Sequence, residues 1–143
     1  VRRNRLAVEW GRSGWRRCVA ADSRETAIEA ARAASDKKAH DILVMDMRDV
    51  LIITDYFIIC SGKTDRQVRS IQEGVEERLA AMGVKPVRRE GVQHRRWILL
   101  DYVDIVVHVF RQEEREYYEI ERLWKDAPNI TWEDGTSGVA DSR

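Results

Sequence analysis

The sequence predicts a single α/β domain of the α+β type, with a mixed sheet of about five strands and flanking helices. A chain of 143 residues is long enough for one domain and too short for two ordinary ones. Its apolar residues switch between helical and strand spacing in the order αββαβββα, and segments of both kinds bury their apolar faces by packing a sheet against helices.

The first expected helix covers residues 26–36. Asp22, Ser23 and Thr26 are all candidate N-caps, and Thr26 with Glu29 has the spacing of a capping box. Alanines dominate its apolar stripe, which indicates close approach to a sheet.

Two strands are expected next, at residues 41–47 and 56–61. The first is rich in Ile, Leu, Val and Met. The second is apolar on both faces around Cys60, so we expect a central strand that is covered on both sides. Cys60 is then a small buried hydrophobic residue.

The second expected helix covers residues 65–82 and has the clearest helical periodicity in the chain. Thr64 and Gln67 form a second candidate capping box, and Gly83 ends the helix. Gly74 lies inside the helix at a cost near 1 kcal/mol relative to alanine, so we expect a group packed close to it. The apolar stripe consists of Val68, Ile71, Val75, Leu79 and Met82.

The C-terminal half predicts three strands and a helix. A short strand at 84–88 contains Pro86 and is therefore expected at an edge. Residues 97–102 and 104–110 are expected to form a tight antiparallel pair, and 112–125 a single helix. The apolar face of that helix is assigned to Tyr117, Ile120, Leu123 and Trp124.

Composition excludes several classes of protein. Lys plus Arg and Asp plus Glu both number 25, so the net charge is zero, which argues against wrapping nucleic acid by bulk charge. No apolar run approaches the roughly 18 residues that span a membrane. Cys18 and Cys60 match no metal or redox spacing. These cysteines fit a reducing compartment, so we expect a cytoplasmic protein.

Residues 1–24 differ from the rest of the chain, because seven arginines stand against two acidic residues, a net charge of +5. Three interpretations remain open: a disordered tail from a misassigned start, which Val1 favours, an arm that touches RNA, or an organelle transit peptide. We assign 25–130 to the folded domain and 131–143 to a polar tail.

Asp101, Asp104 and His108 are the strongest candidates for chemistry. Two carboxylates and an imidazole near one turn could bind a metal ion or serve a nucleotidyltransferase-like enzyme. The alternative is structural, since Asp is common at tight turns and a single strand histidine usually satisfies local contacts. Residues 61–64, Ser-Gly-Lys-Thr, lack the first glycine of a P-loop and are better explained as a capped helix start.

Trp97 and Tyr118 are expected at the surface, outside the apolar stripes of their elements. Arg115 is expected beside Tyr118 on the helix surface, while Tyr117 and Trp124 are assigned to the core. Exposed Trp, Tyr and Arg are enriched in the residues that dominate protein-binding energy, so this group predicts a protein-binding site.

Four segments in order resemble the Iojap-like ribosomal silencing factors. Residues 53–62, ITDYFIICSG, resemble the family's TDYFVICSG segment, and 66–71 resemble RQVxAI. Residues 97–110 resemble WxLLDYGDIVVHVF, and 115–124 fall on RxxYxLExLW. The resemblance covers about residues 26–130.

The resemblance implies a nucleotidyltransferase-like fold without catalytic carboxylates. It implies a protein that is not an enzyme and that uses no metal, cofactor or small-molecule substrate. It implies binding to the large ribosomal subunit through ribosomal protein uL14, which blocks joining of the small subunit and represses translation when nutrients are scarce. It also implies a homodimer when free. A minor rRNA contact by residues 1–24 stays open on their charge alone, since they match no part of the family. The family's contact residues correspond to Trp97, Asp101, Arg115 and Tyr118.

One departure from the family concerns the turn between the last two strands, where Val103 stands in place of the usual glycine. A β-branched residue tolerates a positive φ poorly, so we expect this turn to be of another type.

Overall fold

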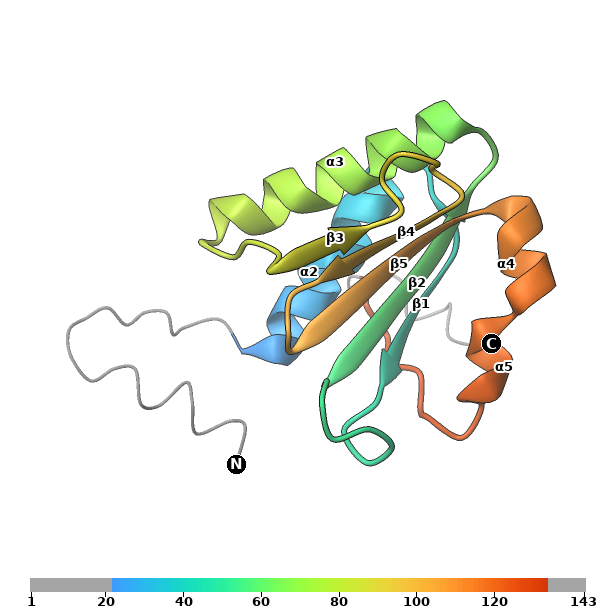
Figure 1. Ribbon diagram of the computed structural model, residues 1–143. Coiled ribbons are helices and arrows are strands. Elements are labelled where there is room, and N and C mark those ends of the chain that lie inside the picture. The colour runs from blue at the N-terminus through green and yellow to red at the C-terminus, as the bar shows by residue number, and fades with distance from the viewer. Residues whose placement is uncertain (1–21, 134–143) are drawn as a thin grey trace.

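The computed structural model describes residues 22–133, drawn in colour in Figure 1. The assigned segments 1–24 and 131–143 lie almost entirely outside them. None of the helices in this part of the chain is long and apolar enough to cross a membrane. The elements are α2 Ser23–Asp36, β1 His40–Asp46, β2 Tyr56–Gly62, α3 Asp65–Ala81, β3 Arg88–Glu90, β4 Trp97–Asp101, β5 Ile105–Arg111, α4 Gln112–Tyr118 and α5 Ile120–Leu123.

The five strands form one mixed sheet in the order β1-β2-β5-β4-β3, which confirms the predicted fold class. β2 and β5 are parallel, and every other neighbouring pair is antiparallel. α2 and α3 cover one face of the sheet, whereas α4 and α5 lie on the opposite side, where α4 contacts β5 and β2 (Figure 1). One face is therefore closed by helices and the other is left partly open.

α2 begins three residues earlier than predicted, because Asp22 is its N-cap and accepts from the backbone N–H of Glu25 at 2.8 Å. Thr26 is buried, and its hydroxyl donates to the carbonyl of Asp22. The predicted capping box of Thr26 with Glu29 is wrong, since Glu29 instead pairs with Arg78 of α3 at 3.1 Å. Glu29 also pairs with Arg32 of its own helix at 2.9 Å, so its carboxylate bridges α2 and α3 and does not cap α2.

α3 starts as predicted, with the Thr64 hydroxyl accepting from the backbone N–H of Gln67 at 3.0 Å. The Gln67 side chain accepts from the N–H of Lys63, one residue before the usual capping-box donor. The close packing expected at Gly74 is confirmed: a Cβ there would lie 2.8 Å from Cε of Lys37.

β3 lies later than the predicted strand at 84–88. It spans Arg88–Glu90, and its three residues are exposed at the edge of the sheet. Pro86 has no N–H to donate, so pairing with β4 begins when the N–H of Val87 donates to the carbonyl of Asp101 at 2.8 Å.

The single helix predicted over 112–125 is wrong, because the chain breaks at Glu119, which adopts φ 42° and ψ 50°. The break changes the direction of the chain, so the residues of the predicted apolar stripe do not lie on one common face. Ile120 is buried and Trp124 partly buried, while Tyr117 is 79% exposed and Leu123 is also exposed.

Candidate functional site

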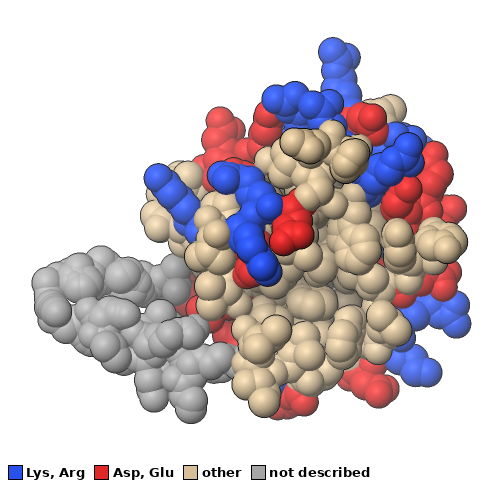
Figure 2. Space-filling view, viewed as in Figure 1, with Lys and Arg blue, Asp and Glu red and all other residues tan. Residues whose placement is uncertain are grey.

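The sheet face opposite α2 and α3 carries apolar and aromatic side chains that α4 and α5 cover only in part. We call this surface the open face. Strand alternation places on it Phe57 and Ile59 of β2, Trp97, Leu99 and Asp101 of β4, and Val106, His108 and Phe110 of β5. Figure 2 looks onto this side and shows a broad area of uncharged side chains in its lower and right-central part, with charged side chains near the centre and along the upper and right edges.

Trp97 is the partly buried aromatic anchor of the open face. Its indole stacks on Phe110, with ring centroids 4.8 Å apart and an interplanar angle of 28°. Its Nε1–H donates to Nδ1 of His108 at 3.2 Å. The indole is thus held both by a ring and by a hydrogen bond.

Tyr118 reaches the open face from the end of α4. Its ring centroid lies 5.0 Å from that of Trp97, and the residue is 48% exposed. The structure therefore brings together two residues that are 21 positions apart in the sequence. Tyr118 is exposed as predicted, whereas Trp97 is less exposed than expected.

His108 lies beneath these rings and is only 5% exposed. Its ring packs edge-on against Phe57, with centroids 4.8 Å apart. Burial in these apolar surroundings lowers the pKa of His108 to about 4, because an imidazolium would lose its hydration. The ring is therefore neutral near pH 7.

Asp101 sits at the far end of β4, four residues from Trp97. Its carboxylate pairs with Arg88 at 3.2 Å and accepts from the N–H of Val103 at 2.9 Å. Val103 has φ 77°, and the N–H of Asp104 donates to the carbonyl of Tyr102, as in a three-residue γ-turn. The turn is thus a γ-turn, and Val103 adopts the positive φ that a β-branched residue tolerates poorly, with these two hydrogen bonds closing the turn.

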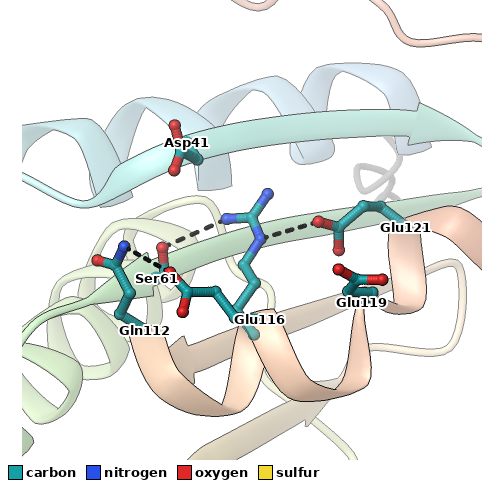
Figure 3. Close-up of a pocket in the computed structure, with 7 residues that line it drawn as sticks. Asp41, Ser61, Gln112, Glu116, Glu119 and Glu121 are labelled. Atoms are coloured by element: carbon teal, nitrogen blue, oxygen red, sulfur yellow. Dashed lines mark hydrogen bonds and ion pairs between the residues drawn. The ribbon is translucent and has the colours of Figure 1, made fainter.

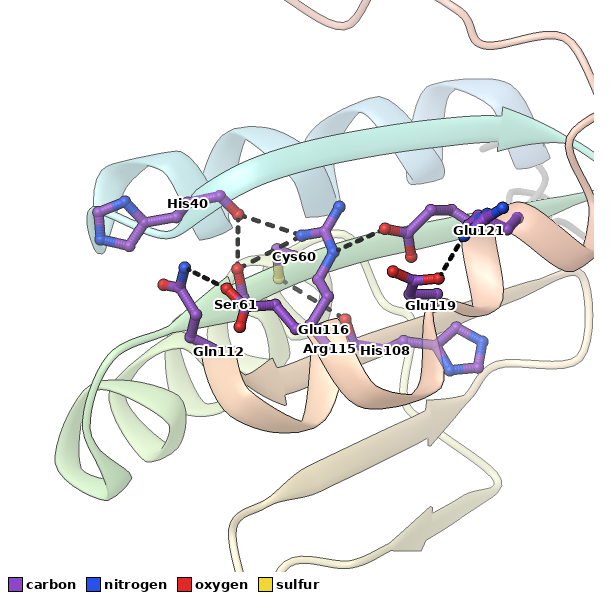
Figure 4. A network of polar contacts seen from close by, with 10 residues as sticks. His40, Cys60, Ser61, His108, Gln112, Arg115, Glu116, Glu119 and Glu121 are labelled. Atoms are coloured by element: carbon purple, nitrogen blue, oxygen red, sulfur yellow. Dashed lines mark hydrogen bonds and ion pairs between the residues drawn. The ribbon is translucent and has the colours of Figure 1, made fainter.

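Arg115 points into the protein, contrary to the predicted surface position. It is 7% exposed, and its guanidinium donates at 3.4 Å each to Glu121, to the hydroxyl of Ser61 and to the carbonyl of His40 (Figure 4). These contacts tie α4 to β1, β2 and α5. The sequence signal was Ser61, a polar residue ending a central strand that needs a buried partner.

Carboxylates surround the outer side of Arg115. They line a pocket of about 210 Å³ beside α4, shown in Figure 3. Glu119 is paired with Arg122 at 2.8 Å, and Glu116 accepts from Gln112. Polar groups that line the pocket are therefore engaged in local ion pairs and hydrogen bonds around the start and end of α4.

The proposed chemical trio is not assembled into a metal site. Within residues 22–133, no group of three His, Cys, Asp or Glu side chains could hold a metal ion. His108 accepts a hydrogen bond from Trp97, and Asp101 forms an ion pair with Arg88 and accepts from a backbone N–H of the turn. Cys60 is fully buried, which raises the pKa of its thiol to about 12 and leaves it a small hydrophobic residue, as predicted.

In comparisons with known proteins, the chain matches the family described as "Ribosomal silencing factor during starvation" over residues 20–143. The ribosomal silencing factor RsfS of Bacillus subtilis is 44% identical over 99 residues, 69% of this chain and 84% of that protein. A crystal structure from Bacillus halodurans has a TM-score of 0.67 at 35% identity, over 76% of this chain and 98% of its own. One from Chromobacterium violaceum has a TM-score of 0.72 at 30% identity, over 82% and 98%.

Proposed function

Because the chain belongs to the ribosomal silencing factor family, we propose that it silences ribosomes by binding the large subunit through its open face. The docking partner on that subunit is ribosomal protein uL14. The bound protein blocks joining of the small subunit sterically and so represses translation under nutrient limitation. The observation that carries this assignment is the Trp97–Tyr118 ring pair on a sheet face that helices leave partly open.

The ring pair has the properties of a protein-binding anchor. Trp and Tyr dominate binding energy at interfaces, and rings already held in place lose little conformational entropy on docking. Asp101 adds a charged group at the margin of the same face, paired with Arg88 in the free protein. We assign Trp97, Asp101 and Tyr118 as contact residues.

Arg115 takes a different role in this proposal. Its guanidinium is buried between α4, α5 and the sheet, so it offers little surface to a partner. We propose that it holds α4 in place and thereby sets the position of Tyr118, three residues further along the same helix.

The proposed activity is steric occlusion, so it requires no chemical step and no cofactor. We further propose that the free protein forms a homodimer, because a partly open apolar face favours self-association. Light scattering of the purified chain measures the mass directly, and a monomer at micromolar concentration would contradict that part of the proposal.

The test is co-sedimentation of the chain with isolated large subunits, together with sucrose-gradient analysis of subunit joining. The wild-type protein should sediment with large subunits and reduce the joined-ribosome peak, and cross-links should map to uL14. Unchanged gradient profiles at saturating protein would contradict the proposal.

A matched pair of variants locates the contact. Tyr118→Ala should weaken binding by about 2 kcal/mol, roughly thirtyfold, because it removes an anchor ring. Leu123→Ala truncates an exposed apolar side chain on the neighbouring helix α5, and this variant should bind as wild type. Both residues are exposed, so both variants should unfold within a few degrees of wild type. Equal binding by the two variants would place the contact elsewhere.

A further inference from the structure

One ring nitrogen of His108 forms a hydrogen bond, and the other has no partner among residues 22–133. Trp97 can only donate through Nε1–H, so the neutral imidazole must present Nδ1 as the acceptor and carry its proton on Nε2. Nε2 is buried, and no group among residues 22–133 accepts from it. The ring therefore satisfies the indole and leaves its own N–H without a partner.

This arrangement is costly for a core position. Burying an unpaired N–H loses the hydrogen bonds that water would make, and an aliphatic side chain of similar size would avoid that loss. Phe57 and Phe110 pack against the same ring and make the surroundings apolar. What the imidazole supplies, and an aliphatic residue would not, is the acceptor for the indole.

The indole in question is the anchor of the open face. Trp97 is stacked on Phe110 from one side and touched by Tyr118, but ring contacts alone allow an indole to slide and rotate in its plane. A directional bond from Nε1 removes that freedom. Fixing an anchor before docking lowers the entropy cost of binding.

We propose that His108 is a positioning residue for ribosome docking: its Nδ1 holds the Trp97 indole in the orientation that the partner recognises. This inference rests on the proposed function. His108 does not touch the partner, because its side chain lies beneath the rings. Its effect on docking passes through Trp97 alone.

A matched pair of variants separates the acceptor from the packing. His108→Asn places a carbonyl oxygen near the position of Nδ1, whereas His108→Leu has nearly the same size and no acceptor. In the full chain labelled with ¹⁵N, the indole N–H signal of Trp97 is identified by its loss in Trp97→Phe. We expect this N–H to exchange with solvent at least tenfold faster in His108→Leu and near the wild-type rate in His108→Asn.

Binding to isolated large subunits is measured on the same proteins. We expect His108→Asn to bind within threefold of wild type and His108→Leu at least tenfold more weakly, with both variants folded. If His108→Leu does not fold, His108→Phe replaces it, since a phenyl ring fills the same space without an acceptor.

Two results would overturn the inference while leaving the proposed function intact. The first is wild-type binding by a folded variant that lacks the acceptor. The second is equal loss of binding in His108→Asn and His108→Leu when the indole N–H stays protected in the asparagine variant. Failure of the wild-type chain to bind large subunits would instead overturn the proposed function, and this inference with it.

Discussion

His108 links the stability of the domain to pH. Its pKa is about 4 in the folded protein and 6.5 for an ordinary histidine. Between these values the unfolded chain binds a proton that the folded chain does not, so the free energy of unfolding falls as pH falls from 6.5 toward 4. The full loss is on the order of 3 kcal/mol.

Urea denaturation of wild type and His108→Asn at pH 7.5, 6, 5 and 4.5 measures this contribution. The asparagine does not titrate, so its free energy of unfolding should fall less than that of wild type over the range. His40, His94 and the carboxylates are common to both proteins and cancel in the comparison. Parallel pH curves would show that His108 is not held neutral by burial.

Val103 is a second residue whose conformation costs free energy. An L-residue at positive φ loses roughly 1–2 kcal/mol, and glycine avoids this at an entropy cost of about 0.5–1 kcal/mol. Val103 has φ 77° and is exposed, so Val103→Gly should raise the free energy of unfolding by up to about 1 kcal/mol. Urea denaturation checks the sign.

Val103→Ala is the control for that comparison, because alanine keeps the Cβ that strains the turn. It should not stabilise the protein. A glycine variant less stable than wild type would mean that the entropy cost of glycine exceeds the strain relieved at this positive φ.

At the scale of elements, the β3–β4 connection sets where Trp97 begins its strand. Gly91 has φ 77°, and a Cβ on it would lie 2.0 Å from the carbonyl oxygen of Trp97. Gly83, after α3, has φ 83° and open space around it. The two glycines share a backbone conformation and differ in crowding.

Gly83→Ala should therefore cost about 1 kcal/mol of stability, from the positive φ alone. Gly91→Ala should cost a further 1–3 kcal/mol or so, because the loop or β4 must shift to relieve the clash. Thermal unfolding measures both, and the Gly91 variant should also bind large subunits more weakly. Equal destabilisation would show that the loop yields without moving Trp97.

Periodicity predicted elements well where one face is buried along their whole length. α3 follows its stripe from Val68 to Leu79, and β4 and β5 pair as expected. It failed for the last helix, because nothing in the spacing of Tyr117, Ile120 and Leu123 marks the left-handed residue Glu119. A glutamate at positive φ is held there by its surroundings, which local spacing does not encode.

At the scale of the whole molecule, charge divides the chain into a basic start and an acidic remainder. Six arginines precede residue 22, whereas the proposed docking residues lie within the folded domain. We expect a chain lacking residues 1–21 to keep its binding to large subunits. If the segment touches rRNA, each lost phosphate contact should reduce the slope of log affinity against log salt by about 0.7–0.9.

Co-sedimentation across a KCl series measures that slope for the full and shortened chains. A shallower slope in the shortened chain supports the RNA-arm interpretation of residues 1–24. An unchanged slope contradicts it. Loss of binding at every salt concentration would contradict the assignment of docking to the open face.

The sequence by itself determined the fold class, the order of the elements up to β5, the interior position of β2 and the family, because these depend on apolar periodicity and on motifs in fixed order. Only the tertiary structure decided which polar side chains are buried and with which groups they form hydrogen bonds. Arg115 lies inward, with its guanidinium 3.4 Å from both the Ser61 hydroxyl and the His40 carbonyl, and His108 accepts from the Trp97 indole N–H. Such pairings join residues distant in sequence, so no local pattern reveals them.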